Sequence, residues 1–157
     1  MEAIRQKDNQ IVVVNHDPKF RIRTSSVVYL AEKILKKLRY QNSYLNIVFE
    51  TDHRVRQLNQ KFLKHNWFTD VLAFPFNNRL SPYRKRFLGE IIISPKRAQV
   101  QAKHFGTSFC EELSRYVCHG ILHLAGYRDK ANDDKKKMCR KENEILNSAK
   151  PILRKII

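Results

Sequence analysis

Hydrophobic residues fall into four short runs, separated by polar and turn-forming residues. The runs cover residues 10–14, 45–49, 71–76 and 88–93, and most of their positions carry valine, isoleucine, leucine or phenylalanine. Apolar runs of this length, bounded by turn residues, are typical of buried β-strands. The pattern therefore predicts four strands.

Between these runs, apolar positions recur every three or four residues, which is the period of an amphipathic helix. The first such segment runs to Leu38, and Ser25 or Ser26 is its expected N-cap residue. Further helices are expected over residues 52–63, from Pro95 to about residue 105, after a capping box of Ser108 and Glu111, and over much of 131–148. Because the chain has no internal repeat and no linker-like composition, residues 1–157 are predicted to form a single α+β domain.

The segment HGILHLAGYRD, at residues 119–129, carries the most specific chemistry. Two histidines four residues apart share one face of a helix. Gly126 can take the left-handed conformation that ends a helix, and the returning chain would bring Asp129 over the imidazole rings. A catalytic zinc ion needs three protein ligands and an open fourth position. His119, His123 and Asp129 are therefore the candidate ligands, on a helix expected to be central to the fold.

Other interpretations of this segment stay open from the residues alone. A histidine pair on an apolar helix can be hydrogen-bonded in a core without any metal. The spacing is also that of the metzincin zinc signature, but Gly120 replaces the glutamate that those proteases use as general base, which disfavours peptide hydrolysis. Two histidines and an aspartate also accept nickel, cobalt or manganese.

The net charge of the chain indicates which classes of molecule it could bind. The chain has 31 Lys and Arg residues against 15 Asp and Glu, which gives a net charge of +16. Such a field attracts polyanions, and nucleic acid is the expected partner, although a solvated basic surface is the alternative. A membrane is the weaker candidate because the longest early apolar run, residues 11–14, is too short for a span or a signal core.

Cysteine usage indicates a reducing compartment. The three cysteines, at positions 110, 118 and 139, show no C-x-x-C spacing and are expected to be reduced thiols. Together with the missing signal core, this predicts a cytoplasmic protein. Cys118 is expected in the core rather than in the metal site, because adjacent helical residues point about 100° apart.

Two basic clusters flank the metal motif in sequence. The loop over residues 77–86 combines cations with one tyrosine, so Arg79, Arg84, Lys85 and Arg86 could hold phosphates while Tyr83 stacks on a base. An exposed turn with solubilising charge is the equal alternative. The second cluster lies at residues 135–141, just after the motif.

Four segments together resemble the YbeY family. They are Leu58-Asn59, TDVLAFPF at residues 69–76, LGEI at 88–91 and HGILHLAGY at 119–127, and the resemblance spans about residues 45–130. It implies a mixed sheet of about four strands packed with helices. It also implies a zinc-dependent, single-strand-specific endoribonuclease that acts on the ribosomal RNA of the small subunit, in maturation of the 16S rRNA 3′ end and in ribosome quality control. Ribosome-associated proteins are possible partners.

The chain departs from the family pattern at three places. Asp129 stands where the family has its third histidine, with Arg128 before it, and its carboxylate can replace imidazole as a zinc ligand. Leu63 occupies the position of the family's arginine, and Glu90 that of an aspartate.

A mechanism follows from the resemblance as a hypothesis. Zinc would lower the pKa of its water or polarise a phosphoryl oxygen. Lys64, Arg79 or Arg84 would neutralise charge on the phosphate, and Glu90 is a candidate for proton transfer, with a structural role as its alternative. A non-catalytic, RNA-binding ribosome assembly factor is the second hypothesis, and a zinc peptidase is the third.

Overall fold

Four strands form one mixed sheet in the order β1-β2-β4-β3. The structure is a computed structural model that describes residues 8–67, 69–76, 85–150 and 156. Strands β1, β2 and β4 run parallel, and β3 pairs with β4 in the antiparallel sense. Their bounds are β1 Gln10–Asn15, β2 Ser43–Phe49, β3 Val71–Pro75 and β4 Arg86–Ile93. The predicted α+β domain with a four-stranded mixed sheet is confirmed.

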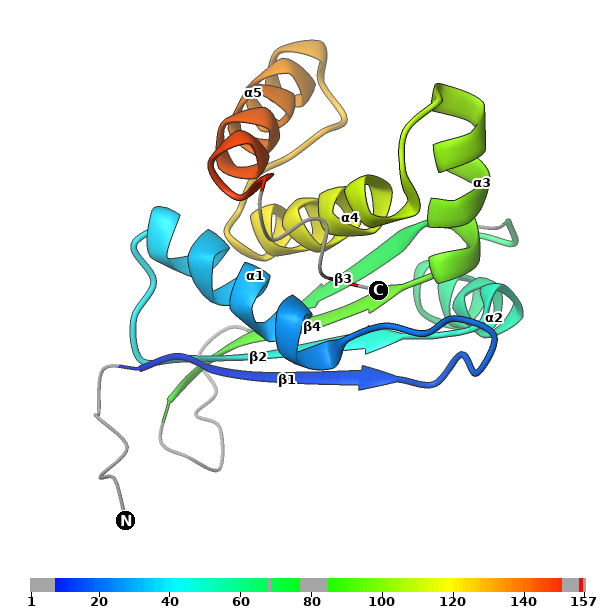
Figure 1. Cartoon of the computed structure of the whole chain (residues 1–157), viewed down its shortest axis with the longest axis horizontal. Helices are drawn as coiled ribbons and strands as arrows, with labels where there is room; N and C mark the ends of the chain where they lie inside the picture. The colour runs from blue at the N-terminus through cyan, green and yellow to red at the C-terminus, as the bar shows by residue number, and fades with distance from the viewer. Residues whose placement is uncertain (1–7, 68, 77–84, 151–155, 157) are drawn as a thin grey trace.

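Five helices accompany the sheet in the described part of the chain (Figure 1). The capping box predicted at Ser108 and Glu111 is present, and Pro95 occupies the first turn of its helix. The predicted caps of the first helix are wrong, because Arg23 is the N-cap residue and its side chain makes no cap hydrogen bond. The bounds are α1 Thr24–Lys37, α2 Asp52–Leu63, α3 Pro95–Phe105, α4 Phe109–Leu124 and α5 Asn132–Ser148.

Helix α4 lies on the same face of the sheet as α1, and α5 packs on α4 (Figure 1). The main hydrophobic core fills the space between these helices and the sheet, with Ile34, Ile47, Ile91 and Ile121 almost fully buried. Gly120 lets α4 approach the sheet closely, because a Cβ atom there would lie 2.6 Å from Cγ2 of Ile91. Contact this tight forces a neighbour to move. The glycine therefore sets how closely the helix carrying the histidines approaches the sheet.

Helix α2 covers the other face of the sheet. Its Val55 packs against Leu72 and Ile92 in a second, smaller core. Successive residues of a strand point to opposite faces. Ile91 therefore faces α4, whereas Glu90 and Ile92 face the side of α2.

No helix in the described ranges is both long and apolar enough to cross a membrane.

Candidate metal centre

The centre lies at the carboxyl-terminal end of α4 and in the turn that follows. His119 and His123 project from successive turns of the helix. Gly126 follows with φ of +97°, as predicted for a helix-ending glycine, and Tyr127 N–H donates to the carbonyl of Leu122 at 3.0 Å. This reversal brings Asp129 back to the two imidazole rings.

Three side-chain atoms converge in this centre. The Nε2 atoms of His119 and His123 are 3.0 Å apart, and Oδ2 of Asp129 lies 3.4 Å from each of them. Tetrahedral zinc with ligands about 2.0–2.1 Å away requires ligand atoms about 3.3 Å from one another. Among the described residues, His119, His123 and Asp129 form the one group of three or more potential ligands close enough to share one ion.

The hydrogen bonds of the histidines favour a cation between them. Nδ1 of His123 lies 3.1 Å from the carbonyl oxygen of Tyr127, and Nδ1 of His119 lies 3.0 Å from Oε2 of Glu142. Both oxygens accept, so each Nδ1 carries a proton, which leaves the Nε2 lone pair of each ring for a metal ion. Two lone pairs and a carboxylate oxygen directed at one point repel one another unless a cation or a shared proton lies between them. The donor set therefore fits a metal ion.

Glu142 is the buried partner that orients this centre. Its side chain is 8% exposed, and its other oxygen accepts from Nη1 of Arg115 at 3.1 Å. Burial lowers the pKa of His119, but the hydrogen bond and charge of Glu142, with the charges of Asp70 and Asp129, outweigh that effect and raise the pKa above its usual value. The same negative charge favours binding of a cation.

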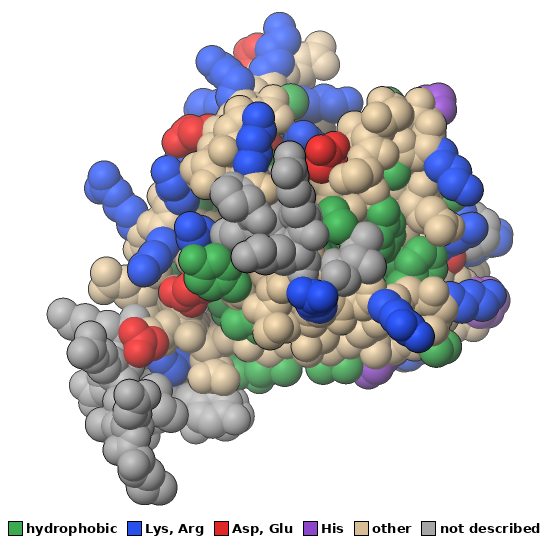
Figure 2. All heavy atoms as spheres, viewed as in Figure 1, with side chains coloured by type: hydrophobic (Ala, Val, Ile, Leu, Met, Phe, Trp, Pro, Cys, Tyr) green, Lys and Arg blue, Asp and Glu red, His purple; other side chains and the backbone are tan. Residues whose placement is uncertain are grey.

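One side of the centre is open to solvent. The side chains of His119, His123 and Asp129 are 29%, 28% and 37% exposed. A cavity of about 340 Å³ adjoins the turn, with Arg128 and Lys137 in its lining. Figure 2 shows more Lys and Arg than Asp and Glu side chains on one face of the molecule. The three side chains are thus accessible to a ligand, and two cations line a cavity beside the turn that follows α4.

The structure does not bring Glu90 to the histidines. Glu90 lies on the α2 side of the sheet, next to Asn46 and Phe74 in register, while α4 covers the opposite face. Burial raises the pKa of Glu90. This position does not support a role for Glu90 in proton transfer at the metal centre. A structural role, the alternative considered from the sequence, fits it better.

Those predicted cations that the structure describes are dispersed. Lys64 is an exposed residue at the end of α2, the helix on the face away from α4. Lys85 is buried and its amine donates to the carbonyl of Asp8, whereas Arg86 is exposed beside the ring of Tyr40. The remaining loop residues, Arg79, Tyr83 and Arg84, lie outside the described residues.

Two further predictions concern α4. Cys118 is fully buried, and burial raises the pKa of its thiol to about 12, so it belongs to the core as predicted. Position 120 faces Ile91 of the sheet rather than the metal centre. A general base at that position, as in metzincins, would clash with β4.

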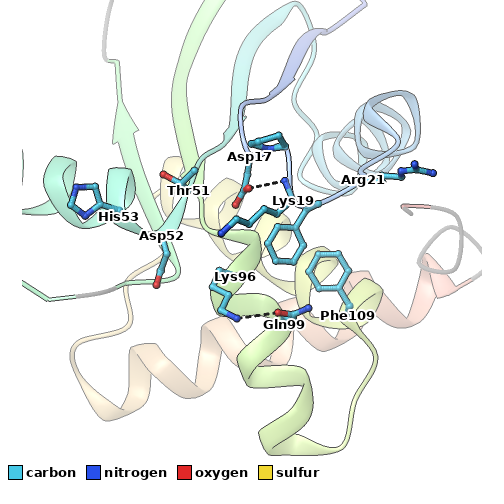
Figure 3. A pocket seen from close by; sticks show the side chains of 11 residues that line it. Asp17, Lys19, Arg21, Thr51, Asp52, His53, Lys96, Gln99 and Phe109 are labelled. Carbon is cyan, nitrogen blue, oxygen red and sulfur yellow. Dashed lines mark hydrogen bonds between the residues drawn. The ribbon is translucent and has the colours of Figure 1, made fainter.

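A separate cavity of about 820 Å³ lies at the other end of α4 (Figure 3). It sits beside the carboxyl ends of β1 and β2, and the stacked rings of Phe20 and Phe109 are 5.5 Å apart in its wall. Phe109 precedes His119 by ten residues, so about 15 Å of helix separates the cavity from the metal centre. None of the three candidate ligands lines it.

Comparison with known proteins identifies the family. Residues 12–150 match the family model described as Endoribonuclease YbeY. The chain belongs to the YbeY endoribonuclease family. An Endoribonuclease YbeY of Thermodesulfovibrio yellowstonii is 35% identical over 90% of this chain and 98% of the relative. One of Aquifex aeolicus is 33% identical over 94% of this chain and 96% of the relative.

A solved structure shares the YbeY-like fold. The solution structure of a Thermotoga maritima protein superposes with a TM-score of 0.59 at 26% identity, over 90% of this chain and 93% of the other. The resemblance noted in the sequence is therefore confirmed.

Sequence reasoning missed two acidic residues of the centre. Asp70, in the TDVLAFPF segment, contributes negative charge at His119. Glu142 occupies the buried stripe of α5 together with Met138 and Ile145. Carboxylates are rarely buried without a partner, so an acid in an otherwise apolar stripe was a usable signal.

Proposed function

We propose that this protein is a metal-dependent endoribonuclease that cleaves single-stranded RNA. We place it in processing of small-subunit ribosomal RNA, at the 3′ end of 16S rRNA, and in ribosome quality control in the cytoplasm, with ribosome-associated proteins as possible partners. The observation that carries the proposal is the convergence of His119, His123 and Asp129 on one point in a chain of this family.

The residues of the centre would hold one zinc ion through Nε2 of each histidine and Oδ2 of Asp129. When bound, zinc supplies Lewis acidity toward a phosphoryl oxygen or water. Glu142 holds the Nδ1 proton of His119, and the carbonyl of Tyr127 holds that of His123, so both rings keep the orientation that ligation needs. A phosphodiester would enter from the exposed side of these ligands, and Arg128 and Lys137, which line the cavity beside the turn, are candidates to neutralise it.

The remaining RNA contacts are proposals from the sequence. Arg79, Tyr83 and Arg84 belong to the predicted RNA-binding loop with Arg86, which is exposed. Lys85, the fifth residue predicted there, is buried with its amine hydrogen-bonded to the carbonyl of Asp8, so a phosphate contact by Lys85 is not supported. Lys64 and Arg84 stay candidates for charge neutralisation, and a single strand is favoured because only an unpaired chain bends into an enclosed site.

A non-catalytic ribosome assembly factor is the second candidate function. It is favoured by the lack of expected catalytic groups. Leu63 replaces the family's arginine, and Glu90 lies on the face of the sheet away from the metal centre. Such a factor would bind RNA through its basic surface and use the metal for structure alone.

Metal content and cleavage separate these functions. We expect about one equivalent of metal in the wild type and a large loss in Asp129→Ala, measured by elemental analysis of the two proteins purified side by side. We expect His119→Ala to abolish cleavage of a single-stranded RNA while the chain still binds it. Cleavage at the wild-type rate by His119→Ala would contradict the proposed mechanism, and binding without cleavage by the metal-loaded wild type would favour the assembly factor.

A further inference from the structure

Large apolar side chains are exposed where α2 ends. Phe62, Leu63 and Trp67 are 56%, 47% and 57% exposed, within six residues of the chain. His65 extends the set, because its ring centroid lies 4.2 Å from that of Trp67. We call Phe62, His65 and Trp67 the aromatic platform. A concentration of exposed apolar area like this one marks a binding surface more often than chance exposure.

The platform is held in place by α2. Lys64 ends the helix with φ of 57°, and its N–H donates to the carbonyl of Gln60. The side-chain amide of Asn59 donates to the carbonyl of Trp67 at 3.1 Å. Phe62 packs edge-to-face on Phe74 of β3, with centroids 5.6 Å apart. The rings are therefore presented on an ordered segment, which reduces the entropy lost when a ligand binds.

The segment that carries the platform has charges of a single sign. Between residues 53 and 69 the chain carries four cations and no aspartate or glutamate. Lys61 lies 5.3 Å from the ring centroid of Phe62, and Lys64 is exposed between the aromatic residues. The cations are Arg54, Arg56, Lys61 and Lys64. Aromatic rings on a segment whose charged side chains are all cations fit an anionic ligand with flat, exposed faces.

We propose that the aromatic platform binds unpaired RNA nucleotides by stacking their bases, while the surrounding cations contact the phosphates. Stacking on aromatic side chains within a basic surface is how proteins bind single strands without reading their sequence. A duplex hides its base faces and does not fit. The inference rests on the proposed function for the identity of the polymer, and it adds a surface on the α2 side of the sheet, apart from the metal ligands.

The chain carries a built-in probe, because Trp67 is its single tryptophan. We would titrate the full-length chain with a short single-stranded RNA in the presence of a chelator, which prevents cleavage, and record tryptophan fluorescence. Stacking of a base on the exposed indole is expected to quench it. A duplex RNA of the same length is expected to leave the emission largely unchanged.

Affinity measured by fluorescence anisotropy of a labelled RNA tests how much the platform contributes to the free energy of RNA binding. We expect Trp67→Ala to weaken binding of the single strand about fivefold or more, which is the range of base–aromatic stacking. Phe105→Ala is the matched control, because this phenylalanine is 64% exposed at the end of α3, outside the platform. We expect Lys64→Ala to reduce the slope of log affinity against log salt by about 0.7.

The outcomes distinguish this proposal from the proposed function. Binding of RNA by Trp67→Ala at wild-type affinity, with no quenching in the wild type, would overturn the platform and leave the endoribonuclease intact. No binding and no cleavage of RNA would overturn both. A sedimentation experiment in which Trp67→Ala dissociates a dimer, or an emission shift with anionic vesicles but not with RNA, would assign the surface to self-association or to membranes instead.

Discussion

Replacing Glu142 with glutamine tests whether this buried carboxylate tunes the metal centre. Both of its oxygens are engaged, one by Nδ1 of His119 at 3.0 Å and the other by Nη1 of Arg115 at 3.1 Å. Glutamine has the same shape but only one acceptor oxygen, so one of the two donors would face an NH₂ group. Loss of a partner of a ligating histidine weakens metal affinity about 10- to 100-fold, or about 1.4–2.8 kcal/mol.

The assay is competition for zinc between the protein and a chromophoric chelator. Glu144→Gln is the matched control, because Glu144 lies on the same helix, is 60% exposed and pairs only with Lys141 at 3.4 Å among its charged neighbours in the described residues. We expect its zinc affinity to equal that of the wild type. Thermal unfolding of each metal-free chain shows whether the fold is kept. If Glu142→Gln folds and binds zinc as tightly as the wild type, the argument that Glu142 orients His119 is refuted.

Three further predictions concern stability, each measured by urea unfolding. Gly120→Ala should lower the free energy of unfolding, because overpacking against β4 costs about 1–3 kcal/mol and the gain in helix propensity offsets about 1 kcal/mol; a more stable variant would contradict this. Burial raises the pKa of Asp52, but hydrogen bonds from Arg97 and Ser94 outweigh it and the net pKa is lowered. The pair of Asp52 and Arg97 therefore stabilises the fold fully at pH values above 3.8, the ordinary pKa of the carboxyl. This contribution is lost as the pH falls through the lowered pKa. Asp52→Asn should cost about 1–2 kcal/mol at neutral pH, with a difference from the wild type that shrinks in acid; a pH-independent difference would refute the assignment. Ser108→Ala should lower the free energy of unfolding by about 1 kcal/mol and Ser25→Ala should leave it almost unchanged, because Ser108 caps a helix and Ser25 does not. Equal effects of the two substitutions would contradict the cap assignment.

Much of the fold was predictable because its signals are local. Runs of apolar residues marked the four strands, and the capping box at Ser108 and the proline at position 95 marked two helix starts. The cap of α1 was not predictable from the residue types, because Ser25 and Ser26 are good cap residues that fall inside the first turn. Packing of the helix against the sheet sets its start, and local propensity yields to it.

The candidate metal ligands were predictable because they lie close together in the sequence, whereas Glu142 is distant from them. His119, His123 and Asp129 lie within eleven residues, so helix geometry and one glycine turn bring them together without knowledge of the rest of the fold. Glu142 reaches His119 only because α5 docks on α4, which is a long-range contact.

The face of the sheet on which Glu90 lies depends on the register of β4, and a shift of one residue would change it. Had the strand been shifted by one position, Glu90 would have taken the place of Ile91 beneath Gly120, facing α4. Periodicity could not decide between the two faces, because all of residues 91–93 are isoleucine and each face of β4 is apolar. A run of apolar residues buried on both sides predicts a strand, but it does not predict which side chains point to which face of the sheet. Local sequence could therefore indicate the candidate ligands of the centre, while the residues that surround them had to come from the tertiary structure.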